Sequence, residues 1–164
     1  MKIKNITVAF LLLLGTWFLL NGKYDLVTLG VGVIVSLFIS LIMCIKCEIF
    51  SEMNFSPKGI LYFFAYIFVF LGELVKSNLD IARRVLTPSL PINPGIVEVE
   101  TKLKSKLGRM ILANSITLTP GTLSVKVEND TYFIHCVNVE HTDIEGATKD
   151  IIKKFEKYLE VIYG

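Results

Sequence analysis

The first half of the sequence contains three long apolar runs, whereas the second half alternates apolar and polar residues over short segments. Residues 26–45 form an uncharged run of twenty residues, enough helix to cross a hydrocarbon layer of about 30 Å at about 1.5 Å per residue. Residues 6–20 form a run of fifteen residues, about 22 Å of helix, which would cross only with tilt or local thinning. A third run begins after Pro57 and covers residues 59–75. We therefore expect about three transmembrane helices within residues 1–86.

A short polar turn, Asn-Gly-Lys-Tyr-Asp at residues 21–25, separates the first two runs and predicts an antiparallel helical hairpin. The first run follows Lys2 and Lys4 and therefore also resembles a signal peptide. No small-x-small cleavage pattern precedes Asn21-Gly22, so we expect this run to be retained as a helix.

The third run predicts a helix over residues 59–86, with a membrane span over residues 59–80. At three- and four-residue intervals it places a charge stripe on one face, formed by Glu73, Lys76, Asp80, Arg83 and Arg84. Such a helix would be about 42 Å long and would project about 12 Å beyond the hydrocarbon. Glu73 would be either a member of a proton or cation relay or an interfacial carboxylate paired with Lys76. We favour the pairing, because one carboxylate at the edge of a span does not make a relay.

Three prolines, Pro88, Pro91 and Pro94, are followed by Gly95 and predict a stiff, extended linker over residues 87–95. This linker would separate the membrane region from a soluble α/β domain at residues 96–164.

The polar half predicts five elements in the order β-α-β-β-α. Strands are expected at residues 96–101, 121–128 and 131–139, and helices at residues 104–118 and from Thr142 onward. The last helix opens with a candidate capping box, Thr142-Asp143-Ile144-Glu145. The third strand places Tyr132, Ile134, Cys136 and Asn138 on one face, and Phe133, His135, Val137 and Val139 on the other. This order corresponds to a ferredoxin-like, split β-α-β domain without its last strand, small enough for docking to contribute to its stability.

The most specific segment of the chain is LANSITLTPGTLSV at residues 112–125. Pro120 lacks an N–H and disfavours helical angles at Thr119, so the helix should end before Thr119. Pro120-Gly121 is a common turn pair, and beyond it Leu123, Val125 and Val127 alternate with polar residues as in a half-buried strand. The hydroxyls of Thr117, Thr119 and Thr122 are expected to satisfy backbone groups around this turn.

Together with Pro94-Gly95-Ile96-Val97 and Leu103-Lys104-Ser105, this segment resembles the E subunit of Mrp-type multi-subunit cation/proton antiporters. The resemblance implies an accessory subunit of a monovalent cation (sodium)/proton antiporter, multi-pass in a prokaryotic plasma membrane, with a cytoplasmic C-terminal domain. It also implies other membrane subunits and the lipid bilayer as partners. The family motif would act as a docking surface formed by Asn114, Thr117, Thr119, Pro120, Gly121 and Thr122.

Two other functions stay open. Related subunits occur in membrane-bound hydrogenases and related respiratory oxidoreductase complexes, where partner subunits would carry the redox chemistry. The chain could also be a stand-alone membrane-anchored module whose ferredoxin-like domain binds a small ligand.

Composition and charge exclude several other classes. Hydrophobic residues make up 52% of the chain, and nine of its eleven Phe precede Pro88, as expected for a membrane region followed by a polar domain. Residues 89–164 carry nine Lys/Arg against ten Asp/Glu, which leaves no basic surplus for nucleic-acid binding. The remaining basic excess, eight Lys/Arg against five Asp/Glu, lies in residues 1–88.

The residues needed for catalysis are mostly missing. Cys44 and Cys47 have metal-ligand spacing but no second pair or nearby histidine in the sequence. His135 and Cys136 are neighbours on a predicted strand, so their side chains point to opposite faces. No nucleophile or phosphate-binding motif occurs. We expect no catalytic residues, cofactor or metal, and therefore not an enzyme.

Charge alone does not orient the chain. With three crossings, four cations face each side of the membrane, Lys2, Lys4, Lys46 and Lys58 on one and Lys23, Lys76, Arg83 and Arg84 on the other.

Overall fold

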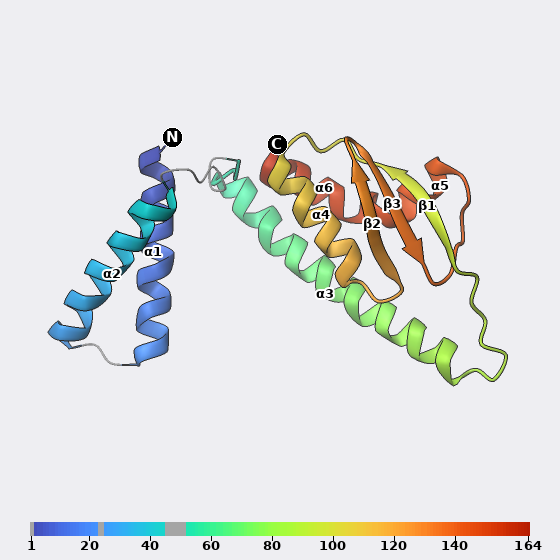
Figure 1. Cartoon of the computed structure of the whole chain (residues 1–164), viewed down its shortest axis with the longest axis horizontal. Helices are drawn as coiled ribbons and strands as arrows, with labels where there is room; N and C mark the ends of the chain where they lie inside the picture. Colours follow the sequence, from blue (N-terminus) through green and yellow to red (C-terminus); the bar gives the residue numbers. More distant parts are fainter. Residues whose placement is uncertain (1, 23–24, 45–51) are drawn as a thin grey trace. The chain divides into compact units, whose positions relative to one another are not determined.

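The computed structural model describes residues 2–22, 25–44 and 52–164, and the chain divides into two compact units, Met1–Met53 and Asn54–Gly164 (Figure 1). The sequence predicted a division at the Pro-rich residues 87–95. The observed division lies upstream of the third apolar helix instead, because that helix packs on the α/β elements that follow it. Each unit is described by itself.

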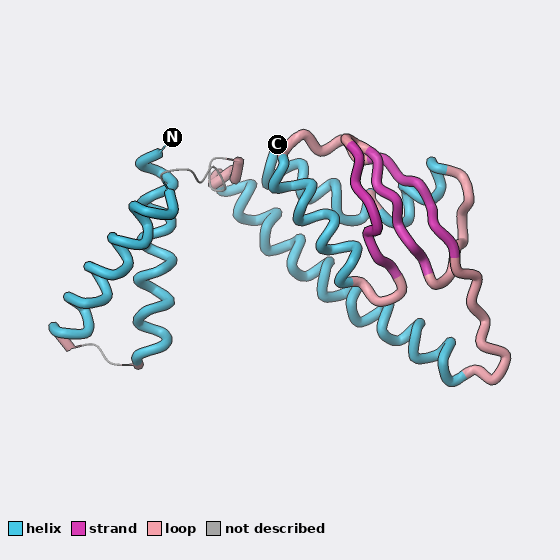
Figure 2. The backbone as a smooth tube through the Cα atoms, viewed as in Figure 1, coloured by secondary structure: helices cyan, strands magenta, loops and turns pink. Residues whose placement is uncertain are grey.

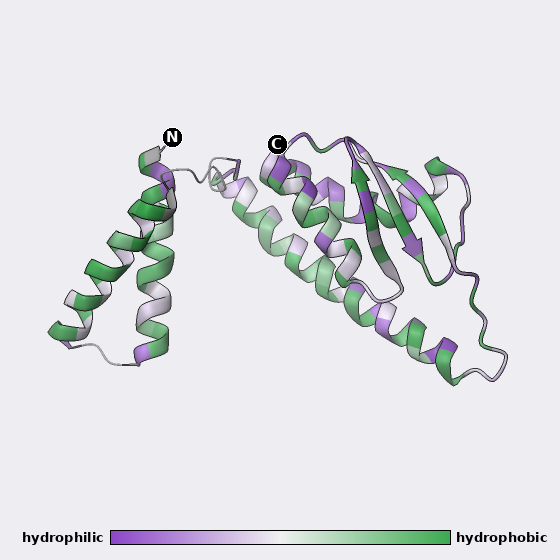
Figure 3. Cartoon of the chain, viewed as in Figure 1, coloured by the Kyte–Doolittle hydropathy of each residue, from purple (hydrophilic) through white to green (hydrophobic). Residues whose placement is uncertain are grey.

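The first unit is the predicted helical hairpin of α1 (Lys2–Asn21) and α2 (Leu26–Cys44). Asp25 caps α2 by accepting the Thr28 N–H at 2.7 Å, and the Trp17 indole N–H donates to the Thr28 carbonyl at 3.0 Å. Gly32 lies against the Trp17 ring, where a Cβ would stand 2.5 Å from Cδ1. Both helices are apolar along their length (Figure 3).

The helices occupy the positions of the three predicted spans. Among the described residues, two helices are long and apolar enough to cross a membrane, Ile3–Asn21 in α1 and Pro57–Leu86, which is α3. Leu26–Ile42 in α2 forms a shorter apolar helix, and the last residue of the predicted span 26–45 lies outside the described residues.

The second unit begins with α3, which Ser56 caps by accepting the Gly59 N–H and which has Pro57 in its first turn. The helix runs to Leu86 and packs along α6 (Lys153–Tyr163). In the last turn of α3, Arg84 reaches the linker and donates to the Pro91 carbonyl at 2.7 Å. The linker therefore leads the chain back onto the same compact unit.

The sheet contains β1 (Gly95–Glu100), β2 (Thr122–Glu128) and β3 (Thr131–Cys136) in the order β1-β3-β2, with both pairings antiparallel (Figure 2). Helix α4 (Lys106–Leu118) connects β1 to β2, which are parallel to each other with β3 between them. Helix α5 (Ile144–Ile151) packs on β1 and α4 packs on β2, while α6 packs against both helices and α3 adds an outer layer against α6. The predicted order of elements is present.

Two features of the last helix differ from the prediction. The helix is broken at Ile152, so it forms α5 and α6 rather than one continuous element. Its N-cap is Asp143, which accepts the Gly146 N–H at 2.8 Å, and not Thr142 of the predicted capping box. Hydrogen bonds from the backbone N–H groups of Gly146 and of Asp143 itself stabilise the ionised carboxylate at this helix N-terminus and lower the pKa of Asp143.

The core lies between the sheet and its helices. Tyr132, Ile134 and Cys136 of β3 are buried against the helices, as their alternation predicted. The alternation predicted for β2 is wrong, because a β-bulge between Ser124 and Lys126 changes which face each side chain occupies. Leu123 pairs with His135, whereas Val127 pairs with Tyr132 on the opposite face of the sheet.

Candidate functional site

The family-like motif forms the end of α4, a turn and the start of β2. Thr119 is the C-cap of α4, and its N–H donates to the Ser115 and Ile116 carbonyls at 3.2 Å each. The helix ends where Pro120 required it to end. Gly121 has φ +94°, a conformation that L-residues rarely adopt, and its carbonyl accepts the Val137 N–H at 2.9 Å.

The threonine hydroxyls of the motif engage the backbone, as the sequence suggested. Thr119 Oγ1 donates to the Ser115 carbonyl at 2.8 Å, and Thr122 Oγ1 lies 2.7 Å from the Ile116 carbonyl and 2.9 Å from the Thr119 carbonyl. Thr117 Oγ1 accepts the Ser124 N–H at 3.2 Å. These hydroxyls therefore fix the helix-to-strand connection.

The motif also packs on α3. A Cβ added to Gly121 would lie 3.1 Å from Ile81 Cδ1, so the turn sits directly on this helix. One turn before the C-cap, the Ser115 hydroxyl is hydrogen-bonded to the Tyr66 hydroxyl of α3. The sequence assigned the motif and α3 to different domains and gave no sign of this contact.

Two ion pairs organise the charge stripe of α3. Glu73 Oε2 lies 2.7 Å from Lys154 Nζ of α6, and both side chains are partly buried. Asp80 and Arg84, one turn apart, form a second pair at 2.7 Å. The predicted pairing of Glu73 with Lys76 is wrong, because Glu73 points toward α6 while Lys76 stays exposed on the flank of the helix.

A polar cleft lies between α3, the motif turn and the segment after β3. It consists of two adjoining hollows of about 140 and 350 Å³ that share Thr122, Asn138, Glu140, Ile151 and Lys154. The smaller hollow is also lined by the turn residues Thr119, Pro120 and Gly121 and by Asp80 and Arg84. The larger is also lined by Glu73, Lys76, Cys136, His141 and Asp150.

The predicted site residues therefore separate into two groups. The turn Thr119–Thr122 and the charges Glu73, Lys76, Asp80 and Arg84 meet in the cleft. Asn114 and Thr117 are exposed on α4, and Arg83 is exposed on α3. Lys154 and Glu140 also line the cleft, and the sequence analysis identified neither. Lys154 lies in the amphipathic helix α6 and Glu140 in a loop, and no motif surrounds either residue.

The cleft contains paired charges and no activated nucleophile. Burial raises the pKa of the Cys136 thiol, so this cysteine is protonated at neutral pH. His141 Nε2 lies 3.0 Å from Asp150 Oδ2 at the outer edge of the cleft. Within residues 2–22, 25–44 and 52–164, no group of three or more His, Cys, Asp or Glu side chains is placed to hold a metal ion.

The other candidate ligands are accounted for separately. His135 and Cys136 lie on opposite faces of β3, as predicted, with Cys136 buried and His135 paired with Leu123 on the other face. Of the Cys44–Cys47 pair, Cys47 lies outside the described residues.

Comparison with known proteins gives matches over nearly the whole chain. A family model described as "Na+/H+ ion antiporter subunit" matches residues 10–162. The E subunit of the Na(+)/H(+) antiporter of Alkalihalophilus pseudofirmus is 33% identical over 141 residues, covering 86% of this chain and 87% of that protein. The corresponding E subunit of Bacillus subtilis is 37% identical over 97 residues, covering 58% of this chain and 60% of that protein.

A solved structure is similar in both fold and sequence. It is a chain of the membrane-bound sulfane sulfur reductase, an archaeal respiratory membrane complex, with a TM-score of 0.85 and 43% identity. The match covers 97% of this chain and 99% of that chain.

Proposed function

Because this chain belongs to the family of Na+/H+ antiporter E subunits, we propose that it is an accessory component of a multi-subunit monovalent cation (sodium)/proton antiporter. In this role it supports the assembly and stability of the complex and does not carry the ion pathway. Its α/β domain, with α4 crossing from β1 to the parallel β2 around β3, acts as a split β-α-β brace on the cytoplasmic side. Its partners are other membrane subunits.

One observation carries the proposal: the carboxylates of α3 are neutralised by cations of the same compact unit. Glu73 is 2.7 Å from Lys154, and Asp80 is 2.7 Å from Arg84. A relay carboxylate must bind and release a proton or cation during each cycle, whereas each carboxylate of α3 has a cationic side chain of the same unit as its partner. The Glu73–Lys154 pair therefore serves to fix α3 on α6 of the α/β domain, whereas the Asp80–Arg84 pair lies within α3 and holds Arg84, which also donates to the Pro91 carbonyl of the linker.

The test compares single and paired neutralisation of the Glu73–Lys154 bridge in the complete complex. Glu73→Gln leaves Lys154 without its carboxylate partner and should lower the amount of assembled complex, because an unpaired, partly buried charge is destabilising. Glu73→Gln combined with Lys154→Gln removes both charges and should restore much of the assembly. Sodium/proton exchange by inverted vesicles, normalised to the amount of complex, should stay near the wild-type value in both variants.

A relay role gives the opposite result. In that case Glu73→Gln would abolish exchange in normally assembled complexes, and adding Lys154→Gln would not recover it. Lys153→Gln is the matched control, because Lys153 is the exposed neighbour of Lys154 on α6 and lies outside the bridge.

A second host is a respiratory oxidoreductase complex, favoured by the 43% identity and TM-score of 0.85 to the sulfane sulfur reductase chain. In this host the chain would have the same bracing role, and partners would carry the redox chemistry. Gentle detergent extraction followed by mass spectrometry of co-purifying subunits separates the hosts. Antiporter subunits alone support the first, iron–sulfur subunits support the second, and a chain that purifies alone contradicts both.

A further inference from the structure

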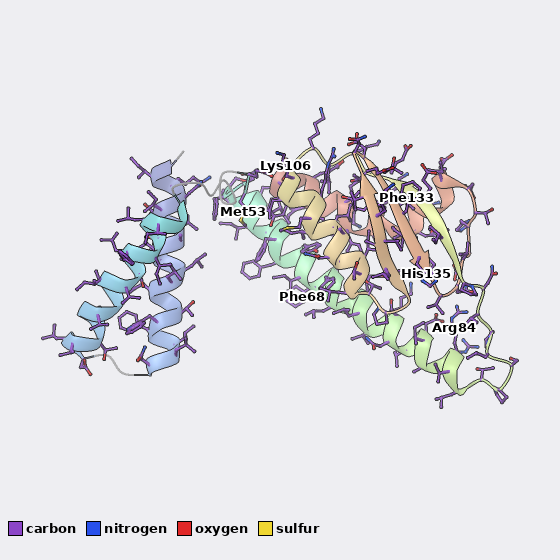
Figure 4. The ribbon with its side chains drawn as sticks, viewed as in Figure 1. Met53, Phe68, Arg84, Lys106, Phe133 and His135 are labelled. Carbon is purple, nitrogen blue, oxygen red and sulfur yellow. The ribbon has the colours of Figure 1, made fainter. Side chains whose placement is uncertain are left out.

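The face of α3 that points away from the α/β domain is a continuous apolar surface. Its residues follow one another every three or four positions from Leu61 to Leu79, with Leu86 two turns further on, and they are between 49% and 82% exposed. This outer stripe consists of Leu61, Phe64, Phe68, Leu71, Val75, Leu79 and Leu86. It runs nearly the full length of a 30-residue helix, and Phe68 is labelled on it in Figure 4.

The opposite face of α3 is occupied by the α/β domain over most of its length. Just before the helix, the Asn54 N–H donates to the Ile162 carbonyl at 2.7 Å. Along the helix, the Tyr66 and Phe70 rings contact Phe155, with centroids 6.4 and 6.3 Å apart. Toward its C-terminal end, Ile81 meets Gly121. The packing is therefore lateral, along the helix, and not confined to one end.

Lateral packing is incompatible with α3 crossing a bilayer. A hydrocarbon layer of about 30 Å needs about twenty helical residues. Every twenty-residue window within Pro57–Leu86 contains Phe70 and Glu73, so every crossing would place Phe155 and Lys154 of α6 at membrane depth. The exposed charges of α6 and the open edges of β1 and β2 would enter the lipid with them, where unsatisfied backbone and charged groups are strongly disfavoured.

The charges of α3 are arranged for a membrane surface instead. Lys58, Lys76 and Arg83 are exposed and lie along one flank of the outer stripe, because they are 18 and 7 residues apart on a helix of 3.6 residues per turn. The carboxylates Glu73 and Asp80 lie on the domain side and are paired. An apolar stripe bordered by cations is the pattern of a helix that lies in the interface of an anionic membrane.

We propose that α3 lies parallel to the membrane surface, with the outer stripe in the lipid interface and the α/β domain on its water-facing side. The third predicted span is then an interfacial helix. The placement holds for either host complex and does not depend on the accessory role.

The placement also resolves the orientation. With α1 and α2 as the two crossings, the cations close to the spans fall on one side, Lys2, Lys4, Lys46 and Lys58, against Lys23 on the other. Four against one replaces the tie of the three-span arrangement, and the positive-inside rule then puts the α/β domain in the cytoplasm.

Depth measurement with spin labels tests the proposal in the full chain within its complex. In a background with Cys44, Cys47 and Cys136 replaced by alanine, one cysteine at a time is placed at residues 61, 64, 68, 75 and 79 and labelled with a nitroxide. Collision with oxygen, which prefers lipid, is compared with collision with a water-soluble nickel chelate. Lys104→Cys, exposed on the α/β domain, is the aqueous reference.

All five labels are expected at a similar depth, about 5–10 Å below the headgroups. A profile that is deepest near residue 68 and returns to water toward both ends would establish a crossing helix and overturn the proposal. Labels that neither oxygen nor the nickel chelate can reach would show that a protein partner covers the outer stripe. This result would also overturn the proposal that the stripe lies in lipid. Co-purification of the other subunits verifies assembly of each variant.

Orientation has its own readout. Lys23→Cys in the same background should react with a membrane-impermeant maleimide in right-side-out vesicles and be protected in inverted ones. The reverse result would refute the cytoplasmic placement of the α/β domain.

Discussion

Gly121 gives the sharpest test of the contact between the motif turn and α3. Its φ of +94° lies in a region where a non-glycine residue carries strain of about 1–3 kcal/mol. Alanine at this position would also bring a Cβ to 3.1 Å from Ile81 Cδ1. That atom is the end of a flexible side chain, and an off-rotamer adjustment costs about 0.5–1.5 kcal/mol. Gly121→Ala should therefore destabilise the Asn54–Gly164 unit by roughly 2–4 kcal/mol.

The buried thiol of Cys136 provides the assay. With Cys44 and Cys47 replaced by serine, a thiol-reactive fluorophore reports heating only when Cys136 becomes exposed. For domains of about 100 residues, 1 kcal/mol lowers Tm by about 4 °C or more, so a decrease of roughly 8–16 °C is expected.

Gly72→Ala is the matched control. Gly72 lies in α3 with no atom within 4 Å of its would-be Cβ, so the same substitution should stabilise the helix by about 0.5–1 kcal/mol. Adding Ile81→Val to Gly121→Ala should recover the steric part of the loss and leave the backbone strain. An unchanged Tm for Gly121→Ala would refute the conclusion that this turn requires glycine and is seated on α3.

Four further predictions concern the packing of the α/β domain. Glu156 is buried and accepts hydrogen bonds from the Thr101 hydroxyl at 2.5 Å and the Lys102 N–H at 2.6 Å. Glu156→Ala leaves both donors without this acceptor and should therefore lower the free energy of unfolding by at least about 2 kcal/mol. The thiol assay would show this loss as a lower Tm. Ser105→Ala removes the acceptor for the Gly108 N–H at the start of α4 and should lower the free energy of unfolding by about 1 kcal/mol, measured as Tm in the same assay. Ser105→Asp should retain most of the stability, because its carboxylate can accept the same hydrogen bond. Burial raises the pKa of Tyr132 to about 12, above the unfolded value near 10. Its contribution to the free energy of unfolding is therefore intact below pH 10 and is lost as the pH rises from 10 to 12. Tyr132→Phe should flatten this part of the alkaline unfolding curve measured by circular dichroism. Pro120→Gly should destabilise the folded domain by on the order of 1 kcal/mol and so lower the yield of assembled complex, without altering ion selectivity. Altered selectivity at normal assembly would contradict the structural role of the turn.

The sequence determined the local structure because local rules decide it. The polar break after Leu20 predicted where α1 ends and α2 begins, and Pro120 predicted the end of α4 at Leu118. The alternation in β3 identified Tyr132, Ile134 and Cys136 as its buried face. The segment around the motif turn also carried the family resemblance, which the match to residues 10–162 confirmed.

Local rules fail where an irregularity changes the period. The β-bulge after Ser124 moved Val127 to the other face of β2, although every residue of the strand fits a regular alternation. The break at Ile152 likewise divides a sequence that is amphipathic throughout. The bulge and the break depend on contacts between these segments and the elements packed against them. The pattern of apolar and polar residues within a segment contains no information about those contacts.

Only the tertiary structure decided what α3 does. From the sequence, an apolar helix of this length reads as a membrane crossing, and Glu73 reads as paired with its helical neighbour Lys76. In the folded unit, aromatic contacts with Phe155 and the bridge to Lys154 hold one face of the helix on the α/β domain, and the apolar stripe is left on the other. Length and hydropathy are properties of the helix alone, whereas the burial of each face depends on partners 40 to 90 residues away along the chain.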